Sequence, residues 1–393
     1  MAKTNETKAL KKNKSQFNII GKVKITDKTF NLNNKYNSGW TDNSMYIGVN
    51  CGQGNLVYAE MRGGYNPSKE NTIKAYSKDE KDSSGKSKQT EIAWEDRLDE
   101  SLFDSIAESN FITVGIEKDT GGKTVYKKFL SAYDAVEYIH EHLETDMIVN
   151  VRGNLKYSEY DGNITIKKEI TSIALSQKEE SEFKATFVQS VLFDNSSIGK
   201  VDKEKSVINI NAYVVDYLGN IKIDDTKIEI KKNIVYPINL EMQVNEKNTA
   251  AVNFLLNKYI KVTKKGVLNE LVIEGDIVEG TATVEVTEAD YPDDIKELIA
   301  MGVYTEEEYK GKVISFNGGK RERHMYLRRP ATVSLGKDDS KVLGILFETG
   351  KYTDADLIFY EQIITENTPE SNSEEVNVVE EDADILSMLD MNN

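Results

Sequence analysis

The feature that most constrains the fold is a succession of short segments in which apolar and polar residues alternate. These segments are rich in Val, Ile, Tyr and Thr, and they outnumber the helical patterns. Because successive side chains of a strand point to opposite faces, such alternation predicts strands with one buried side. The 393 residues are 39% apolar and include 20 Tyr and 12 Phe, enough for the cores of two domains. We therefore expect a mainly β protein with a few helices.

Residues 16–180 contain one complete set of predicted elements. The order is three strands, an amphipathic helix and two more strands, with Gly21 in the first strand and Gly153 in the fourth. This is the order of an OB-type β-barrel. A polar insertion over residues 66–90 is expected to form a long mobile loop with a short strand near residues 73–76. The predicted strands cover residues 17–30, 44–51, 55–61, 147–157 and 163–175, a hairpin lies between 111 and 129, and the helix covers 131–143.

The same order of elements returns in residues 181–360, so the sequence predicts two tandem OB-type barrels. A helical, acidic insertion over residues 288–309 separates the last two strands of the second barrel. The two joints between helix and strand also resemble each other in outline, at residues 138–153 and 256–275. The predicted elements of this second set are strands over 183–193, 206–217, 234–244, 271–286 and 324–335, and a helix over 249–260.

The two ends of the chain differ from its middle in charge. Residues 1–15 carry five lysines and one glutamate without an apolar period, which predicts a flexible basic arm. Residues 361–393 carry ten acidic residues and no Lys or Arg, which predicts a disordered acidic tail. The whole chain has a net charge of −16, and removing the tail leaves −6 on the first 360 residues. Basic faces on the folded part are therefore compatible with the composition.

The expected location is the cytoplasm. A single cysteine, Cys51, excludes an intramolecular disulfide and a cysteine-rich zinc site, and it suits a reducing compartment. The N-terminal residues lack the apolar core of a signal peptide, and the sequence has no run of about 18 apolar residues that could span a membrane. If the chain is encoded by a bacteriophage, the compartment is the host cytoplasm.

Residues 147–175, MIVNVRGNLKYSEYDGNITIKKEITSIAL, resemble the last two strands of OB-fold single-stranded-DNA-binding proteins. Together with the acidic end, they make the chain similar to phage replication proteins of that class. The bacterial members close with Ile-Pro-Phe, whereas this chain closes with EEDADILSMLDMNN. The resemblance implies a protein that coats and protects single-stranded DNA in replication, recombination and repair, and that self-associates on DNA. It also implies that the tail competes with DNA for the basic groove and recruits a polymerase, helicase or primase.

Binding an unpaired strand requires rings for bases to stack on and cations for phosphates. The sequence offers both on predicted strands, although each ring could instead fill a core, and the arginines near residue 325 could instead protect an edge strand. The tail offers the partner-binding candidates Asp382, Asp384, Ile385, Leu386, Met388 and Leu389. The DNA-binding candidates are Lys22, Lys24, Trp40, Tyr46, Tyr58, Arg62, Arg152, Lys156 and Tyr157 in the first barrel, and Arg321, Arg323, Tyr326 and Arg328 in the second.

Two other classes of function compete with this reading. The β-domains could bind other proteins in a non-enzymatic adaptor, because fold alone does not decide function. A nuclease is the third class, with Asp290, Asp293 and Asp294 holding magnesium, although helix capping accounts for Asp293 more simply. With three histidines and no serine-elbow motif, the sequence has no recognisable catalytic constellation, so we expect no enzymatic activity, no metal and no cofactor.

Overall fold

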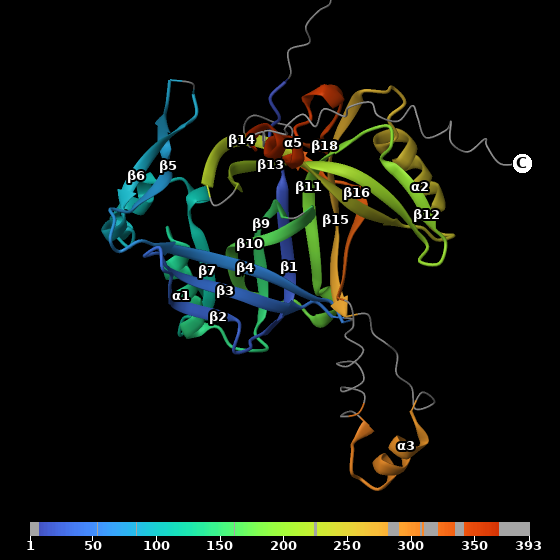
Figure 1. The fold of residues 1–393 in the computed structure, drawn as a ribbon. Helices are drawn as coiled ribbons and strands as arrows, with labels where there is room; N and C mark the ends of the chain where they lie inside the picture. The colour runs from blue at the N-terminus through green and yellow to red at the C-terminus, as the bar shows by residue number, and fades with distance from the viewer. Residues whose placement is uncertain are drawn as a thin grey trace, which may run out of the picture.

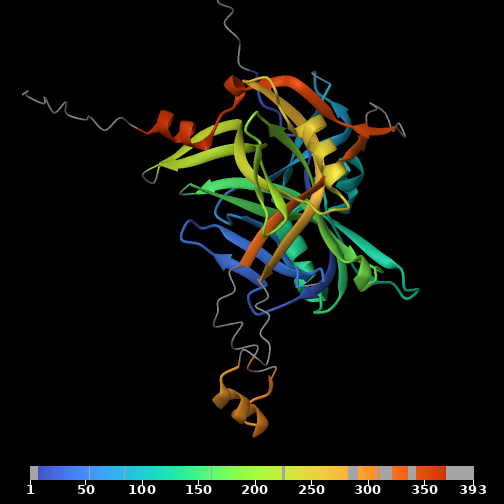
Figure 2. The same cartoon turned by 90° about the vertical axis from the view of Figure 1, so that its right-hand side faces the viewer.

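The computed structural model describes residues 8–52, 54–83, 85–160, 162–223, 226–281, 291–306, 309, 321–334 and 342–368. Strands dominate this part of the chain, as Figures 1 and 2 show, which confirms the prediction of a mainly β protein. Fifteen of the described strands belong to one hydrogen-bonded sheet, and the remaining four form two separate hairpins. Among the described residues, no helix is both long and apolar enough to cross a lipid bilayer.

Five strands of the first half close into a ring, which we call the first barrel. They are β1 (Ser15–Lys24), β3 (Thr41–Asn50), β4 (Leu56–Tyr65), β10 (Asn163–Leu175) and β9 (Ile148–Tyr160), and β9 pairs back to β1. The pairings are antiparallel except that of β4 with β10. The five predicted barrel strands of this half overlap these five strands, and the first of them also reaches the start of β2. Apolar residues at alternate positions of the strands point into a shared core.

Insertions between β4 and β9 extend the first barrel. β7 (Ile112–Lys118) and β8 (Thr124–Phe129) continue the sheet beyond β10, and helix α1 (Ala132–His142) packs against β3, β4 and β7. The predicted short strand near residues 73–76 lies within β5 (Thr72–Lys81), but the prediction of a long loop around it is wrong, because β5 and β6 (Ser87–Ala93) form a hairpin that projects from the body (Figure 1). The polar sequence concealed the hairpin, since Ala75 and Ile92 are the only buried apolar residues among its described positions.

A second ring of five strands, the second barrel, follows in the chain. It consists of β11 (Lys184–Phe193), β13 (Val207–Ile223), β14 (Thr226–Gln243), β16 (Arg321–Pro330) and β15 (Val267–Thr281). Again a single parallel pairing, of β14 with β16, closes the ring. The first ring ends at residue 175 and the second begins at 184, on either side of the predicted boundary at residue 180.

Shorter elements surround the second barrel. α2 (Thr249–Leu255) continues into a wider turn over Leu256–Ile260, and α3 (Asp293–Ala300) stands apart from both barrels in the predicted helical insertion (Figures 1 and 2). Near the end of the described chain, the strand over Phe347–Thr353 pairs with β15 and the helix over Tyr360–Asn367 contacts β14. The remaining elements are β2 (Phe30–Lys35), β12 (Ile198–Asp202), β17 (Thr332–Ser334), β18 (Leu343–Ile345), β19 (Phe347–Thr353) and α5 (Tyr360–Asn367).

The two barrels repeat each other residue by residue in their pairing register. Phe17 of β1 lies opposite Gly153 of β9, and Phe187 of β11 lies opposite Gly275 of β15. At both glycines a Cβ atom would lie within 2 Å of a carbonyl oxygen of the next strand, so each position excludes a side chain. The parallel pairing that closes each ring is also equivalent in the two barrels. Glu60 of β4 pairs with β10 in the first barrel, and Glu241 of β14 pairs with β16 in the second.

The barrels are joined along β1 and β11, which pair antiparallel over six residues with Phe17 opposite Phe187. One hydrophobic core runs through both barrels. A buried ion pair between Lys168 of β10 and Glu279 of β15 also crosses the junction, and Glu279 accepts a hydrogen bond from the backbone N–H of Tyr58. The two halves therefore form one packed body.

Within the predicted flexible arm, residues 1–15, the described residues 8–15 pack against the folded body. Leu10 is buried in a small cluster on the second barrel, Lys12 pairs with Asp216, and the Asn13 amide donates to Glu270. The isolated Leu10 could not be recognised as a core residue because no apolar period surrounds it. The prediction is wrong for residues 8–15, and residues 1–7 lie outside the described part.

The first residues of the predicted disordered tail, 361–367, are helical. Helix α5 includes residues 361–367, and its Ile363 is buried against the core. Just before it, Phe359 contacts Tyr213 and bridges to Val235 of β14. The prediction is therefore wrong for residues 361–367, where apolar side chains anchor an acidic segment. Residues 369–393, including all six partner-binding candidates, lie outside the described residues.

Candidate nucleic-acid interface

Two tyrosines, one exposed and one half-buried, form a pair of stacked rings on the outward face of β3 and β4, which we call the ring face. The centroids of Tyr46 and Tyr58 lie 4.9 Å apart, with an angle of 19° between the ring planes. Tyr46 is 44% exposed, although its position in a strand could have buried it. Gly48 lies opposite Tyr58, and a Cβ there would be 3.3 Å from the Tyr58 ring, so glycine leaves room for the ring to rest on β3.

Lysines from the end of β1 border the ring face. Lys24 pairs with Gly48 across β1 and β3, so its exposed side chain shares the face with Tyr58. It has no ion-pair partner among the residues that the structure describes. Lys22, two residues earlier, pairs with Glu180 on the surface, and this hydrogen bond raises the pKa of the Lys22 ammonium. Lys24 is thus the available cation at this end.

Arg62 borders the other end of the ring face and is held in place. Its Nε donates to the fully buried carboxylate of Asp42, and this hydrogen bond raises the pKa of the guanidinium. Nη2 donates to the Tyr36 hydroxyl at 2.7 Å, and the guanidinium lies 5.4 Å from the centre of the Tyr36 ring. Trp40, 39% exposed, is next in the same loop, where its carbonyl accepts the Tyr36 N–H. Arg62 therefore organises a second aromatic group rather than offering an unpaired charge.

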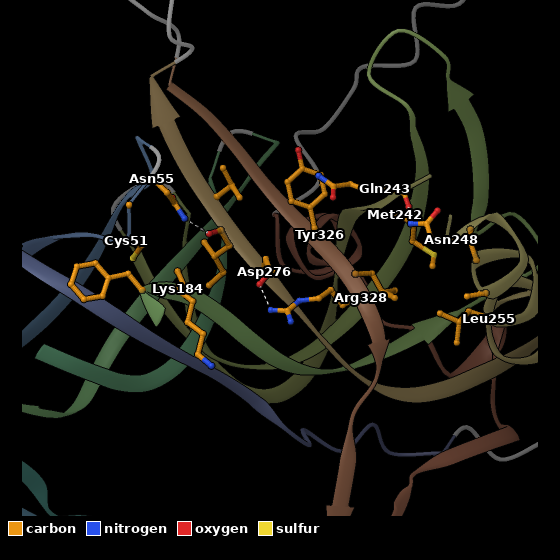
Figure 3. A pocket seen from close by; sticks show the side chains of 18 residues that line it. Cys51, Asn55, Lys184, Met242, Gln243, Asn248, Leu255, Asp276, Tyr326 and Arg328 are labelled. Carbon is orange, nitrogen blue, oxygen red and sulfur yellow. Dashed lines mark hydrogen bonds and ion pairs between the residues drawn. The ribbon is translucent and has the colours of Figure 1, made fainter. Parts of the chain in front are cut away.

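A groove of about 540 Å³ begins at the turn between β3 and β4 and separates the two barrels. Cys51 and Asn55 line it from the first barrel, and α2, β11, β15 and β16 line it from the second. Figure 3 shows Tyr326 in the middle of this groove, with Asn55 on one side and Gln243 and Asn248 on the other. Because the β3–β4 hairpin contributes to both, the groove and the ring face are neighbouring surfaces.

Charged groups in the groove come mainly from the second barrel. Arg328 pairs with Asp276, as the dashed line in Figure 3 shows, and 47% of its side chain is exposed. Lys184 is exposed and has no ion pair within the described part of the chain. Tyr326 stacks on His324, with 5.6 Å between the ring centres. The groove thus combines a ring, two cations and several amides, with one carboxylate.

Only some of the predicted DNA-binding residues lie together in the structure. Tyr46, Tyr58, Arg62 and Lys24 share the ring face, with Lys22 and Trp40 at its margins, whereas Tyr326 and Arg328 lie in the groove. Arg152 and Lys156 lie on β9, which is two strands away from β4 around the barrel. Arg323 lines a separate cavity of about 250 Å³ between the barrels, and the Arg321 side chain lies outside the described residues.

The prediction that Tyr157 stacks on bases is wrong. Tyr157 is 5% exposed, and its hydroxyl donates to Gln189 at 3.1 Å in the core. The physical reason is strand alternation: Lys156 and Tyr157 are neighbours in β9, so they point to opposite faces, and the lysine takes the outer one.

Some lining residues were missed by the sequence reading. Tyr36 and Asn55 lie in turns, where no period marks them, and they reach the site through contacts with distant residues. Phe183 and Lys184 begin the predicted strand over residues 183–193, and an aromatic residue beside a lysine was the one available signal.

The ring pair is confined to the first barrel. Following the repeated register, the counterparts of Tyr46 and Tyr58 in the second barrel are Asn209 and Asn239. In the described part of the second barrel, His324 and Tyr326 of β16 form a stacked pair, and Tyr217 of β13 is 52% exposed. The two barrels therefore share a backbone plan and differ in surface chemistry.

The described residues contain no group of three or more His, Cys, Asp or Glu side chains arranged to hold a metal ion. Asp293 and Asp294 occupy the first turn of α3, where acidic residues favour a helix start, and Asp290 lies outside the described part. The nuclease hypothesis therefore gains no support from the geometry.

Comparison with known proteins gives limited information. Residues 106–291, just under half of the chain, match the model of a family described as YorF. No curated protein matches the sequence. Among solved structures, a deletion mutant of the single-stranded DNA binding protein from Thermus aquaticus aligns with 83% of this chain and 98% of its own, at 8% identity and a TM-score of 0.29. A TM-score of this size does not establish a common fold.

Proposed function

We propose that this chain is a non-enzymatic protein that binds single-stranded DNA, and that its two rings of strands are OB-type barrels. The observation that carries the proposal is the stacked pair of the exposed Tyr46 and the half-buried Tyr58, with Lys24 beside it. OB barrels bind oligonucleotides on the face of their second and third strands, and β3 and β4 hold those places in the first ring. Two rings of this kind offer successive bases a stacking surface.

The bound strand continues from the ring face into the groove, because both surfaces include the β3–β4 hairpin. There Tyr326 offers a further ring, and Lys184 offers a cation for phosphates. Arg328 and Lys22 already have carboxylate partners, but exposed ion pairs contribute only about 0–1 kcal/mol, so a phosphate can replace the carboxylate at low cost. Arg62 keeps its partner, since Asp42 is fully buried.

The wider role follows from this binding mode. The chain coats and protects single strands during replication or recombination, and the acidic residues 369–393 recruit replication proteins through the apolar group around Leu386. These partners are part of the proposal and rest on the sequence resemblance alone.

The test is oligothymidylate binding, measured by fluorescence anisotropy with the full chain. Replacing both rings, Tyr46→Leu with Tyr58→Leu, removes two stacking surfaces worth about 1–3 kcal/mol each, so we expect affinity to fall at least about tenfold. Tyr76→Leu is the matched control: Tyr76 is 48% exposed on β5, away from the ring face, and its replacement should leave affinity unchanged.

The same binding experiment, repeated at increasing salt concentration, provides a second test. Affinity of the unaltered chain should fall steeply as salt rises, because counterions are released from the DNA. Binding by the double variant equal to that of the unaltered chain would show that the ring face is not the site. Failure of the unaltered chain to bind oligonucleotides at low salt would reject the function itself.

A protein-binding adaptor is the second candidate, and one observation favours it. Val342 and Leu343, at the start of β18, are 62% and 64% exposed, and Ile345 of the same strand is 40% exposed. Clustered apolar side chains on a surface mark protein contacts. Loss of a co-purifying partner after Leu343→Ser, without any binding of oligonucleotides, would favour this candidate.

A further inference from the structure

A second pocket lies on the first barrel, two strands around the ring from the ring face. Its volume is about 580 Å³, within the range of about 300–1,000 Å³ that small-molecule sites occupy. It is formed by β8, β9, the end of β10 and the segment that follows β10. The residues that give it chemical character are Tyr126, Asn150, Arg152, Ser172, Lys178 and Glu182.

Arg152 supplies an available positive charge to this pocket. Its side chain is exposed on β9, and its Nε donates a single hydrogen bond, of 3.2 Å, to the Asn18 side chain. The residues opposite it on both neighbouring strands, Asn18 and Ser172, are uncharged. Arg152 has no ion-pair partner in the described part of the chain, whereas Lys178 at the rim is paired with Glu182. The guanidinium is therefore free to bind an anion.

Tyr126 supplies an aromatic surface. Its ring is 60% exposed and occupies the space beside Gly115, where a Cβ would lie 2.6 Å from a ring carbon. Only glycine at position 115 lets the ring lie against the strand in this way, and the other side of the ring stays open. Such a surface suits a planar group, because offset stacking and edge contacts favour aromatic partners.

Asn150 supplies an acceptor that lacks a donor. Its Oδ1 atom is buried and has no hydrogen-bond partner among the described residues. Buried acceptors nearly always have a hydrogen-bond donor in folded proteins, and leaving one without a donor lowers the stability of the fold by about 1–3 kcal/mol. Because this atom is covered in the structure, a ligand N–H would satisfy it once the Asn150 amide turns towards the pocket.

We propose that this pocket binds a nucleotide: the base stacks on Tyr126, an N–H of the base donates to Asn150, and the phosphate binds Arg152. No single weak feature carries the assignment, since a cavity, a free cation, an open ring and an unsatisfied acceptor meet in one place. The nucleotide is either a free molecule or one unit of a bound single strand. Only the second source depends on the proposed function.

The test uses the full chain with two ligands, thymidine monophosphate and oligothymidylates of about 8 and about 40 residues. Calorimetry measures the mononucleotide and anisotropy measures the oligonucleotides, for the unaltered chain, Tyr126→Leu and Arg152→Gln. Arg329→Gln is the matched control, an exposed arginine of β16 paired with Glu274. Unchanged unfolding midpoints establish that each variant folds.

A mononucleotide affinity at least tenfold lower in both variants, but not in the control, supports a site for free nucleotides. A comparable loss for the long oligonucleotide alone, with the short one unaffected, supports a unit of the bound strand. If neither variant changes the binding of any ligand, the proposal is overturned. Mononucleotide binding through Arg152 in a chain that binds no oligonucleotide would retain this site and reject the proposed function.

Discussion

Cys51 lines the groove between the barrels and is 7% exposed. Burial raises the pKa of its thiol to about 12, so the folded chain holds this proton at pH values where the unfolded chain has lost it. Its contribution to stability is therefore complete below the pKa of the unfolded thiol, near 9, and is lost as pH rises towards 12.

We expect the free energy of unfolding to fall more steeply with pH in the unaltered chain than in Cys51→Ala. The extra slope is about 1.4 kcal/mol per pH unit above about pH 9. Urea unfolding at about pH 8 and about pH 10 measures it, and tyrosine ionisation cancels because both proteins share it. Parallel pH profiles would mean that the thiol titrates normally in the fold.

Gly153 and Gly275 mark the same close approach in the two barrels. A methyl group at either position would lie within 2 Å of a backbone oxygen, which no rotation of a side chain can relieve. Each change to alanine should lower the free energy of unfolding by about 3 kcal/mol or more. Gly219→Ala is the control, because the nearest atom there is 3.6 Å away, and its effect should stay within about 0.5 kcal/mol. A small effect at Gly153 would indicate that the strands can separate locally.

At the scale of single residues, the sequence predicted the ring face better than the groove. The sequence named Tyr46 and Tyr58 as candidates on neighbouring strands and left open whether each ring fills a core; in the structure the two rings stack on the outward face. The sequence did not predict that the Tyr58 ring rests against Gly48 or that Arg62 donates to Asp42, because these contacts depend on cross-strand register. Tyr157 was misassigned because the choice of a face requires knowing which strands lie on either side.

Among the elements, β10 and β15 are connected by the buried pair of Lys168 and Glu279. Lys168→Met would leave the carboxylate buried without its cation, and we expect a loss of about 3–5 kcal/mol in the free energy of unfolding. Adding Glu279→Gln removes the charge while keeping an acceptor for the Tyr58 N–H, so the double variant should recover most of the loss. Urea unfolding of the three proteins provides the comparison. An additive effect of the two changes would argue against a direct interaction.

Individual strands were predictable, and their partners were not. Both sets of five barrel strands follow from alternation within a short segment. The pairing of β1 with β11 joins residues about 170 positions apart in sequence, and nothing local in either strand indicates it. The β5–β6 hairpin was not predicted because its strands are mostly charged and show no apolar face. The order of residues 8–14 was not predicted because Leu10 is the one apolar residue of this segment that enters a described core cluster.

For the whole molecule, the ordered α5 determines where the acidic tail can be removed. Residues 369–393 carry eight acidic residues and no Lys or Arg. Deleting them should strengthen oligothymidylate binding about fivefold at low salt, because a competing negative charge is lost. The gain should disappear at high salt. A chain that keeps the same length but replaces the tail carboxylates by amides is the control and should match the deletion; unchanged affinity in both would mean that the tail does not compete for the DNA site.

The register of β1 against β11 gives the molecule an internal pseudo-symmetry. Since Phe17 faces Phe187, its own counterpart, a polypeptide holding one barrel would present an edge complementary to itself. Two copies would meet across a two-fold axis at that phenylalanine and rebuild the continuous sheet. The chain thus has the symmetry of a homodimer made covalent. Because the two halves belong to one polypeptide, they need not be identical, and one has tyrosines where the other has asparagines.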